Sequence, residues 1–323
     1  HTGGTIDKLE SIPGFTCNLT PKQMEDAVEK VGCCIAAQND AIAPADGLLY
    51  AIRDVTNTVD SIPLITASIV SKKAAEGLNA LVLDVKCGHA AFMKTEKDAI
   101  ALAESMVGTA KGLGIDTVAQ ITDMNEPIGS HIGNALEVLG SIRVLQGEGS
   151  QDTRDLVALQ GGQLLALTGD SVTLEQGMNM IHEVLENGEA LRIFIEMCVQ
   201  QGTRRSVAEE LAIHPENILP QSKKVTRLHS PKSGYVESID AMTLAEVARE
   251  LGAGRFTMSD SINHGIGYVL ETVKNHSIQK DEPWISIHHD LELSSEHLNR
   301  LRDCLKIIDQ TSGDFQRLIT TIT

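Results

Sequence analysis

Two cationic side chains and one hydroxyl group stand close together in the sequence, between residues 53 and 72. Ser68 and Lys72 are four positions apart in an apolar segment with Pro63 near its start and Gly77 at its end, so on a helix they share one face. Arg53 belongs to the preceding segment, and an antiparallel helical pair would bring it to that face. Such donors suit a planar, carbonyl-rich ligand, because they bind ring oxygens and stabilise developing negative charge. Spacing alone favours the alternative, a solvated helix face.

A second candidate site is the glycine-rich opening of the chain, "HTGGT". Backbone N–H groups of such a turn, together with the hydroxyl of Thr5, can hold a phosphate group. The pattern by itself favours a plain tight turn, so Thr5 becomes a candidate only in combination with other signals. The chain starts inside this turn at His1, and we expect the natural N-terminus to lie upstream.

The composition limits the kinds of partner. The 323 residues contain Lys+Arg 27 and Asp+Glu 44, which gives a net charge of -17. Nucleic acids and anionic membranes require clustered cations, so neither is an expected partner. A small anionic substrate held by a few local cations remains compatible with this charge. No apolar run approaches the roughly 18 residues of a membrane span, and we expect a soluble protein.

Cysteine and histidine spacing gives little support for a metal site. The six cysteines show no C-x-x-C pattern, which predicts free thiols in a reducing compartment; they are Cys17, Cys33, Cys34, Cys87, Cys198 and Cys304. His288, His289 and Asp290 end a predicted strand, where a turn at a sheet edge is a better interpretation than a metal site. We therefore predict no bound metal.

The elements that must position these groups alternate between strands and helices, which predicts an α/β sheet in the first part of the chain. Helices are expected over residues 21–32, 44–55, 60–77 and 94–114. Strands are expected over residues 33–38, 78–88 and 116–124.

The second half of the chain has two regions with different sequence patterns. Residues 133–202 are mostly helical, including one long helical stretch over 174–202, and the polar residues 203–222 are expected to form a linker. Short strands and two helices then predict a small α+β module. Its strands resemble the hammerhead of biotinyl and lipoyl carriers, but the M-K-M attachment hairpin is missing, which argues against a swinging-arm role.

An ordered set of motifs resembles the thymidine and pyrimidine-nucleoside phosphorylases. The motifs are "HTGGTIDKLESIPGF", "PADGLLYAIRDVTNTVDSIPLITASIVSKKAAEGLNALVLDVK", "HAAFMKT", "GNALEV" and "LGAGR". Single pieces are weak, whereas the ordered set covers almost the whole chain and is strongest from His1 to about Glu137. The "CCI" segment leans toward the animal thymidine phosphorylases.

The resemblance implies reversible phosphorolysis of thymidine to thymine and 2-deoxy-α-D-ribose 1-phosphate. Arg53, Ser68 and Lys72 fall on positions that bind the pyrimidine, with Arg53 and Lys72 as the catalytic cations, and Thr5 falls on the phosphate site. Phosphate is a co-substrate and no cofactor is implied. The resemblance also implies a cytoplasmic homodimer whose lobes close around the two substrates.

The implied fold is a mixed sheet flanked by helices, with part of a helical lobe and a hammerhead-like C-terminal module. Residues 1–44 and 79–213 would form the α/β domain, in the manner of family 3 glycosyltransferases. Residues 45–78 would be the helical-lobe segment that carries the pyrimidine site, and residues 214–323 the C-terminal α+β module.

Departures from the family pattern leave alternatives open. The K-H-S-T-G-G phosphate loop is absent, so the chain as given is expected to be inactive. Cys87 and His89 stand where relatives often carry small or apolar residues, and Gly140 stands where bacterial relatives use a potassium-binding glutamate, so no potassium site is predicted. The alternatives are a broader phosphorylase that also uses uridine, a phosphoribosyltransferase-like enzyme, and a non-enzymatic interaction protein.

Overall fold

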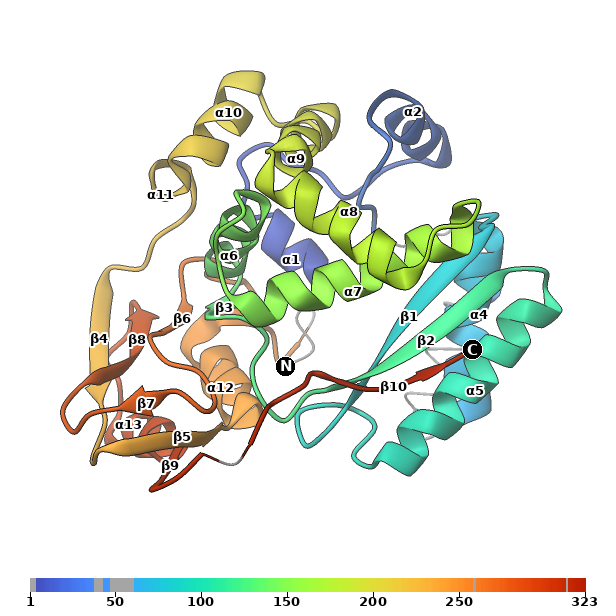
Figure 1. Cartoon of the computed structure of the whole chain (residues 1–323). Helices are drawn as coiled ribbons and strands as arrows, with labels where there is room; N and C mark the ends of the chain where they lie inside the picture. The colour runs from blue at the N-terminus through green and yellow to red at the C-terminus, as the bar shows by residue number, and fades with distance from the viewer. Residues whose placement is uncertain (1–3, 38–42, 47–60, 258–259, 312) are drawn as a thin grey trace. The chain divides into compact units, whose positions relative to one another are not determined.

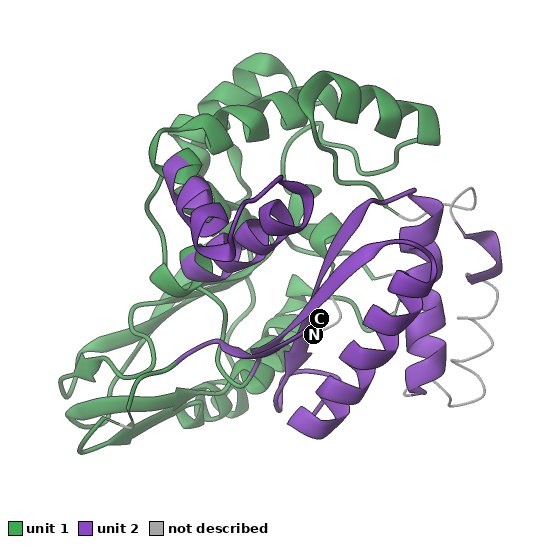
Figure 2. Cartoon of the chain, turned by 45° about the vertical axis from the view of Figure 1, so that its right-hand side comes forward, with its two compact units in different colours: residues 1–37, 125–154, 184–315 green, residues 38–124, 155–183, 316–323 purple. Residues whose placement is uncertain are grey.

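The computed structural model describes residues 4–37, 43–46, 61–257, 260–311 and 313–323 (Figure 1). These residues form two compact units (Figure 2). Unit 1 comprises residues 1–37, 125–154 and 184–315, and unit 2 comprises residues 38–124, 155–183 and 316–323. The expected fold class is confirmed, since the chain combines a mixed sheet flanked by helices with an α+β module near its C-terminus.

Unit 2 is built on a three-stranded sheet with the order β1-β2-β10. Strands β1 (Ala80–Cys87) and β2 (Asp116–Asp123) are parallel, as the apolar runs predicted. Strand β10 (Leu318–Ile322) pairs antiparallel with β2 and makes the sheet mixed.

Two helices pack beside this sheet, α4 (Ile62–Ala75) and α5 (Glu96–Gly112). Thr95 caps α5, because its hydroxyl accepts a hydrogen bond from the backbone N–H of Asp98. Small buried residues such as Ala99 and Ala103 allow α5 to approach the sheet closely. The Thr66 and Ser105 hydroxyls lie 2.8 Å apart and link α4 to α5. The sheet and α5 thus fix the orientation of α4, which carries Ser68 and Lys72.

Helices α7 (Gln151–Thr168) and α8 (Leu174–Glu186) approach each other at glycines. A Cβ atom on Gly162 would lie 2.6 Å from the Met178 nitrogen, and one on Gly177 would lie 2.5 Å from the Gly162 oxygen. No larger residue fits there without moving a helix.

Several helices of unit 1 share one apolar core. They are α1 (Thr5–Leu9), α2 (Pro21–Val31), α6 (Ala135–Leu145), α9 (Glu189–Gln200), α10 (Arg205–Ile213) and α11 (Pro215–Ile218). Gly188 adopts the left-handed conformation with φ +84° and separates α8 from α9, so the long helix expected over 174–202 is interrupted. Helices α10 and α11 occupy the stretch expected to be a linker, which corrects that expectation.

The strand expected at residues 33–38 is wrong over its described part, residues 33–37, which form no regular strand. Instead, the side-chain amide of Gln201 forms hydrogen bonds with the backbone of Ile35. Its Oε1 atom accepts from the Ile35 N–H at 2.9 Å, and its Nε2 atom donates to the Ile35 carbonyl at 2.8 Å. A buried side chain therefore satisfies the groups that a neighbouring strand would otherwise pair. The helix expected over 44–55 lies almost entirely outside the described residues.

The C-terminal part of unit 1 is the predicted α+β module. Strands β3 (His131–Gly133), β6 (Gly267–Leu270), β8 (Pro283–His289) and β4 (Lys224–His229) form one sheet in that order. Strands β7 (Ser277–Ile278), β5 (Gly234–Ile239) and β9 (Leu305–Ile308) form a second sheet. Helices α12 (Ala241–Ala248) and α13 (Ser295–Asp303) complete the module around a core that contains Trp284 and Tyr268.

His289 and the following Asp290 have hydrogen-bond partners, and four of the six cysteines are buried. His289 Nε2 lies 2.8 Å from the Thr226 hydroxyl, and Asp290 accepts from the Lys223 N–H at 2.7 Å. The six cysteines carry free thiols, as predicted, and burial raises the pKa of Cys198 and of Cys304 to about 12. Within the described ranges, no His, Cys, Asp and Glu side chains form a group suited to a metal ion, and no helix has the length and apolar character to cross a membrane.

Replacing Thr20 with alanine should lower the free energy of unfolding by about 1 kcal/mol. Thr20 and Gln23 form a complete capping box at the start of α2, in which Gln23 N–H donates to Thr20 Oγ1 and Thr20 N–H donates to Gln23 Oε1. Urea unfolding measures the change as a lower midpoint with an unchanged slope. Thr20→Ser keeps the cap and serves as the control; an equal loss in both variants would contradict this explanation.

Candidate functional site

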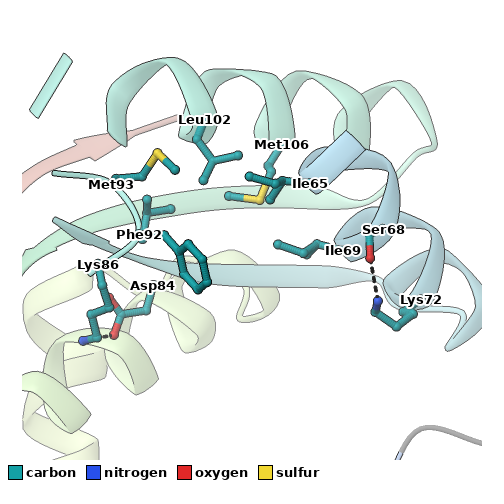
Figure 3. Close-up of a pocket in the computed structure, with 11 residues that line it drawn as sticks. Ile65, Ser68, Ile69, Lys72, Asp84, Lys86, Phe92, Met93, Leu102 and Met106 are labelled. Atoms are coloured by element: carbon teal, nitrogen blue, oxygen red, sulfur yellow. Dashed lines mark hydrogen bonds and ion pairs between the residues drawn. The ribbon is translucent and has the colours of Figure 1, made fainter. Parts of the chain in front are cut away.

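A cavity of about 400 Å³ lies in unit 2, between α4, β1 and α5 (Figure 3). Each of these elements, together with the loop after β1, contributes to its wall. The lining residues are Ile65, Ser68, Ile69, Lys72, Asp84, Val85, Lys86, Phe92, Met93, Leu102 and Met106.

Helix α4 brings Ser68 and Lys72 together at one end of the cavity. Ser68 is buried, with 8% of its surface exposed, and Lys72 Nζ donates to Ser68 Oγ at 3.0 Å. Lys72 Nζ also donates to Oδ2 of the buried Asp46 at 2.7 Å. The predicted shared face is thus present, and Asp46, which the sequence did not indicate, fixes the ammonium group. Within the described chain these bonds use two of the three Lys72 N–H groups, which leaves one donor for a ligand.

A second polar group lines the cavity from β1. Asp84 Oδ2 accepts from Lys86 Nζ and from Gln160 Nε2, both at 2.6 Å, while Asp84 Oδ1 accepts from the Thr122 hydroxyl at 2.5 Å. Burial lowers the pKa of Lys86, and the neighbouring Asp84 opposes this shift. No sequence pattern predicted this network. Its only signal is the pair of charged residues at alternate positions of an apolar strand.

Apolar side chains form the wall between the two polar ends. Figure 3 shows Ile65 and Ile69 on α4, Leu102 and Met106 on α5, and the Phe92 ring beside them. Phe92 borders the cavity with 68% of its surface exposed. The "HAAFMKT" motif contains Phe92, although no sequence pattern assigned this residue a role. An apolar wall with hydrogen-bond donors at its end can bind a flat heteroaromatic ring.

The other two predicted site residues are not among the described residues that line this cavity. Thr5 is the exposed first residue of α1 and belongs to unit 1. Arg53 lies outside the described residues. The structure therefore brings together two of the four predicted residues, Ser68 and Lys72, and the roles of all four stay predictions.

Gly140 of α6, where the sequence argued against a potassium ligand, packs against an imidazole ring. A Cβ atom built on Gly140 would lie 3.1–3.2 Å from the His131 side chain. Burial lowers the pKa of His131, and His288 and Arg143 lower it further. A larger residue at position 140 would have to displace this ring.

Two family models match the chain. Residues 1–191 match the glycosyl transferase family a/b domain, and residues 235–308 match the pyrimidine nucleoside phosphorylase C-terminal domain. These matches cover the α/β part and the C-terminal α+β module that the fold displays.

Curated relatives match over nearly the full chain. Thymidine phosphorylase of Rattus norvegicus is 43% identical over 315 residues, which cover 96% of this chain and 66% of the relative. Thymidine phosphorylase of Homo sapiens is 42% identical, with 96% and 65% covered. Pyrimidine-nucleoside phosphorylase of Bacillus subtilis is 40% identical over 322 residues, with 100% and 73% covered. The chain spans about two thirds of the length of the two mammalian relatives. On this similarity and the matching motifs, the chain belongs to the thymidine and pyrimidine-nucleoside phosphorylase family.

Proposed function

We propose that the protein containing this chain catalyses the reversible phosphorolysis of thymidine to thymine and 2-deoxy-α-D-ribose 1-phosphate. The observation that carries this proposal is the cavity in which Ser68 and Lys72 meet beside an apolar wall. Its size and donors suit a pyrimidine ring, with carbonyl oxygens toward α4 and the ring face against apolar side chains. The relatives named thymidine phosphorylase and those named pyrimidine-nucleoside phosphorylase both support this class of reaction.

In the proposed reaction a phosphate oxygen attacks C1′ of the sugar while the C1′–N1 bond breaks. The electron pair of that bond moves to the pyrimidine, so negative charge develops on N1 and the ring carbonyl oxygens. Lys72 and Arg53 stabilise this charge, and Ser68 orients the ring and the Lys72 ammonium group. Thr5 binds the phosphate, whose own negative charge offsets the oxocarbenium character of the sugar. The proton of hydrogen phosphate ends on N1 of the departing thymine, so phosphate is consumed as a co-substrate and the atoms balance without an organic cofactor.

The broader substrate range is a second candidate. The Bacillus subtilis relative is named a pyrimidine-nucleoside phosphorylase, and its identity to this chain is only slightly below that of the mammalian thymidine phosphorylases. The ring contacts proposed here involve groups that thymine and uracil share. Sugar recognition at C2′ would separate the two substrates.

The test is phosphate-dependent release of base by protein expressed from the complete open reading frame. We expect thymine and 2-deoxyribose 1-phosphate in equal amounts from thymidine, and no release when phosphate is omitted. The ratio of kcat/KM for thymidine and uridine then separates the two candidates. Release without phosphate, or no release at all, would contradict the proposed function.

Organisation and assembly are further proposals. We propose that residues 45–78 act as the base-binding segment, with 1–44 and 79–213 as the α/β domain and 214–323 as the C-terminal module. A cytoplasmic homodimer is proposed on the family resemblance.

A further inference from the structure

The short helix α1, which begins at Thr5, is held by two ion pairs to parts of unit 1 that are distant in the sequence. Asp7 pairs with Arg255, which follows α12, and Lys8 pairs with Glu137 of α6. Asp7 is buried, with 8% of its surface exposed. An isolated five-residue helix is not stable in water, so its position depends on such contacts.

Arg255 also donates a hydrogen bond to a residue close to it in the chain. Its Nη1 atom donates to Asp7 Oδ1, and its Nε atom donates to the Asp260 carbonyl at 3.2 Å. The Asp260 carboxylate accepts from the backbone N–H groups of Phe256 and Thr257, both at 2.9 Å. A hydrogen bond from the Thr257 hydroxyl, together with these two backbone bonds, lowers the pKa of Asp260. The guanidinium group that reaches Asp7 is therefore attached to a hydrogen-bonded loop.

Glu137 is fixed in a comparable way. Its Oε1 atom accepts from the Gly133 N–H at 3.1 Å, and its Oε2 atom lies 3.3 Å from Lys8 Nζ. Burial raises the pKa of Glu137, while Lys8 and the Gly133 N–H oppose the shift. Gly133 has φ +139°, and a Cβ atom there would lie 2.6 Å from the Ile266 carbonyl, so the position of this N–H donor depends on glycine.

Apolar packing fixes the other end of α1. Leu9 and Ile12 are buried in the core cluster that also contains Val138 and Ile142 of α6. The packing holds α1 against the core through contacts that are not directional. The two ion pairs add directional contacts to this packing.

We propose that Arg255 and Glu137 are positioning residues that fix α1 and thereby place the Thr5 hydroxyl for phosphate. This inference rests on the proposed function, in which Thr5 contacts the phosphate co-substrate. It also explains why three motifs occur together: "HTGGT" carries Thr5, "GNALEV" carries Glu137 and "LGAGR" carries Arg255. In this arrangement Arg255 and Glu137 act through α1.

The experiment compares Arg255→Ala, Arg255→Lys and Asp7→Asn in protein from the complete open reading frame. Without the pair, α1 samples several orientations, so the KM for phosphate should rise about tenfold, while kcat at saturating phosphate changes less than twofold and the Kd of thymine is unchanged. Arg255→Lys keeps the charge and should recover part of the loss. Asp7→Asn keeps the size of the side chain and serves if Arg255→Ala does not fold.

Arg300→Ala is the matched control. Arg300 is a similarly exposed arginine of the same module, and it donates to Glu250 at 2.8 Å and to Glu246 at 3.1 Å, on α12 and the turn after it. Its loss removes an ion pair of the same kind without touching α1. We expect it to leave the KM for phosphate unchanged.

Hydrogen exchange of the α1 amides separates this inference from the proposed function. Exchange should be faster in Arg255→Ala and Asp7→Asn than in wild type, and unchanged in Arg300→Ala. If wild type lacks phosphate-dependent activity, the proposed function is wrong, and so is the inference that α1 positions Thr5 for phosphate. If wild type is active but Arg255→Ala matches Arg300→Ala in KM for phosphate or in α1 exchange, the positioning role is overturned.

Discussion

Replacing Lys72 with methionine is expected to lower kcat/KM for thymidine by about two orders of magnitude. Methionine fills similar space but removes the ammonium group that donates to Ser68 and pairs with Asp46. The variant also leaves the negative charge of Asp46 without its Lys72 partner, at the end of the cavity where the proposed reaction develops an anion. Both changes raise the energy of the transition state more than that of bound substrate. Initial rates at varied thymidine and saturating phosphate measure the loss.

The neighbouring residue provides the control for this experiment. Lys73 pairs with Glu76 at 2.8 Å on the surface of α4. Surface pairs contribute at most about 1 kcal/mol to stability, so Lys73→Met should retain most of the activity. Similar rates for the two variants would show that Lys72 does not take part in the reaction.

Local patterns in the sequence were sufficient to predict the helix and strands around the cavity. Pro63 and Gly77 bracket α4, and the four-residue spacing of Ser68 and Lys72 places both on one face wherever a helix forms. The apolar runs of β1 and β2 likewise specify buried parallel strands. These features depend on near neighbours in the chain, which is why pattern reasoning found them.

The features that sequence patterns did not predict depend on contacts between residues that are far apart in the sequence. Strand β10, near the C-terminal end of the chain, pairs with β2, and no local sequence pattern predicts that pairing. Gln201 hydrogen-bonds to both backbone groups of Ile35, within the segment where a strand was expected. Gln160 of α7 donates to Asp84 of β1, so the polar network of the cavity exists only after the chain has folded. Side-chain roles of this kind require the three-dimensional arrangement.

Arg53→Ala is expected to lower kcat/KM for thymidine by roughly two orders of magnitude or more, about 3 kcal/mol in transition-state stabilisation. Arg53 lies outside the described residues, so its role rests on the family resemblance and on its chemistry. A guanidinium group presents paired N–H donors that match adjacent acceptors on a pyrimidine ring. Arg53→Lys keeps the charge but loses this paired geometry, and should fall between wild type and Arg53→Ala. Near-normal turnover by Arg53→Ala would remove Arg53 from the site.

The double variant Arg53→Ala/Lys72→Met tests whether both cations act on the same charge. If both cations stabilise one developing anion on the pyrimidine, removal of one cation already loosens the position of the ring. Removal of the other then raises the transition-state energy by less than it does in wild type. The two losses in transition-state energy should then fail to add by more than about 0.5 kcal/mol. Losses that add within that limit would mean that the residues act on separate parts of the substrate. In that case the Ser68–Lys72 end of the cavity would bind the base without Arg53.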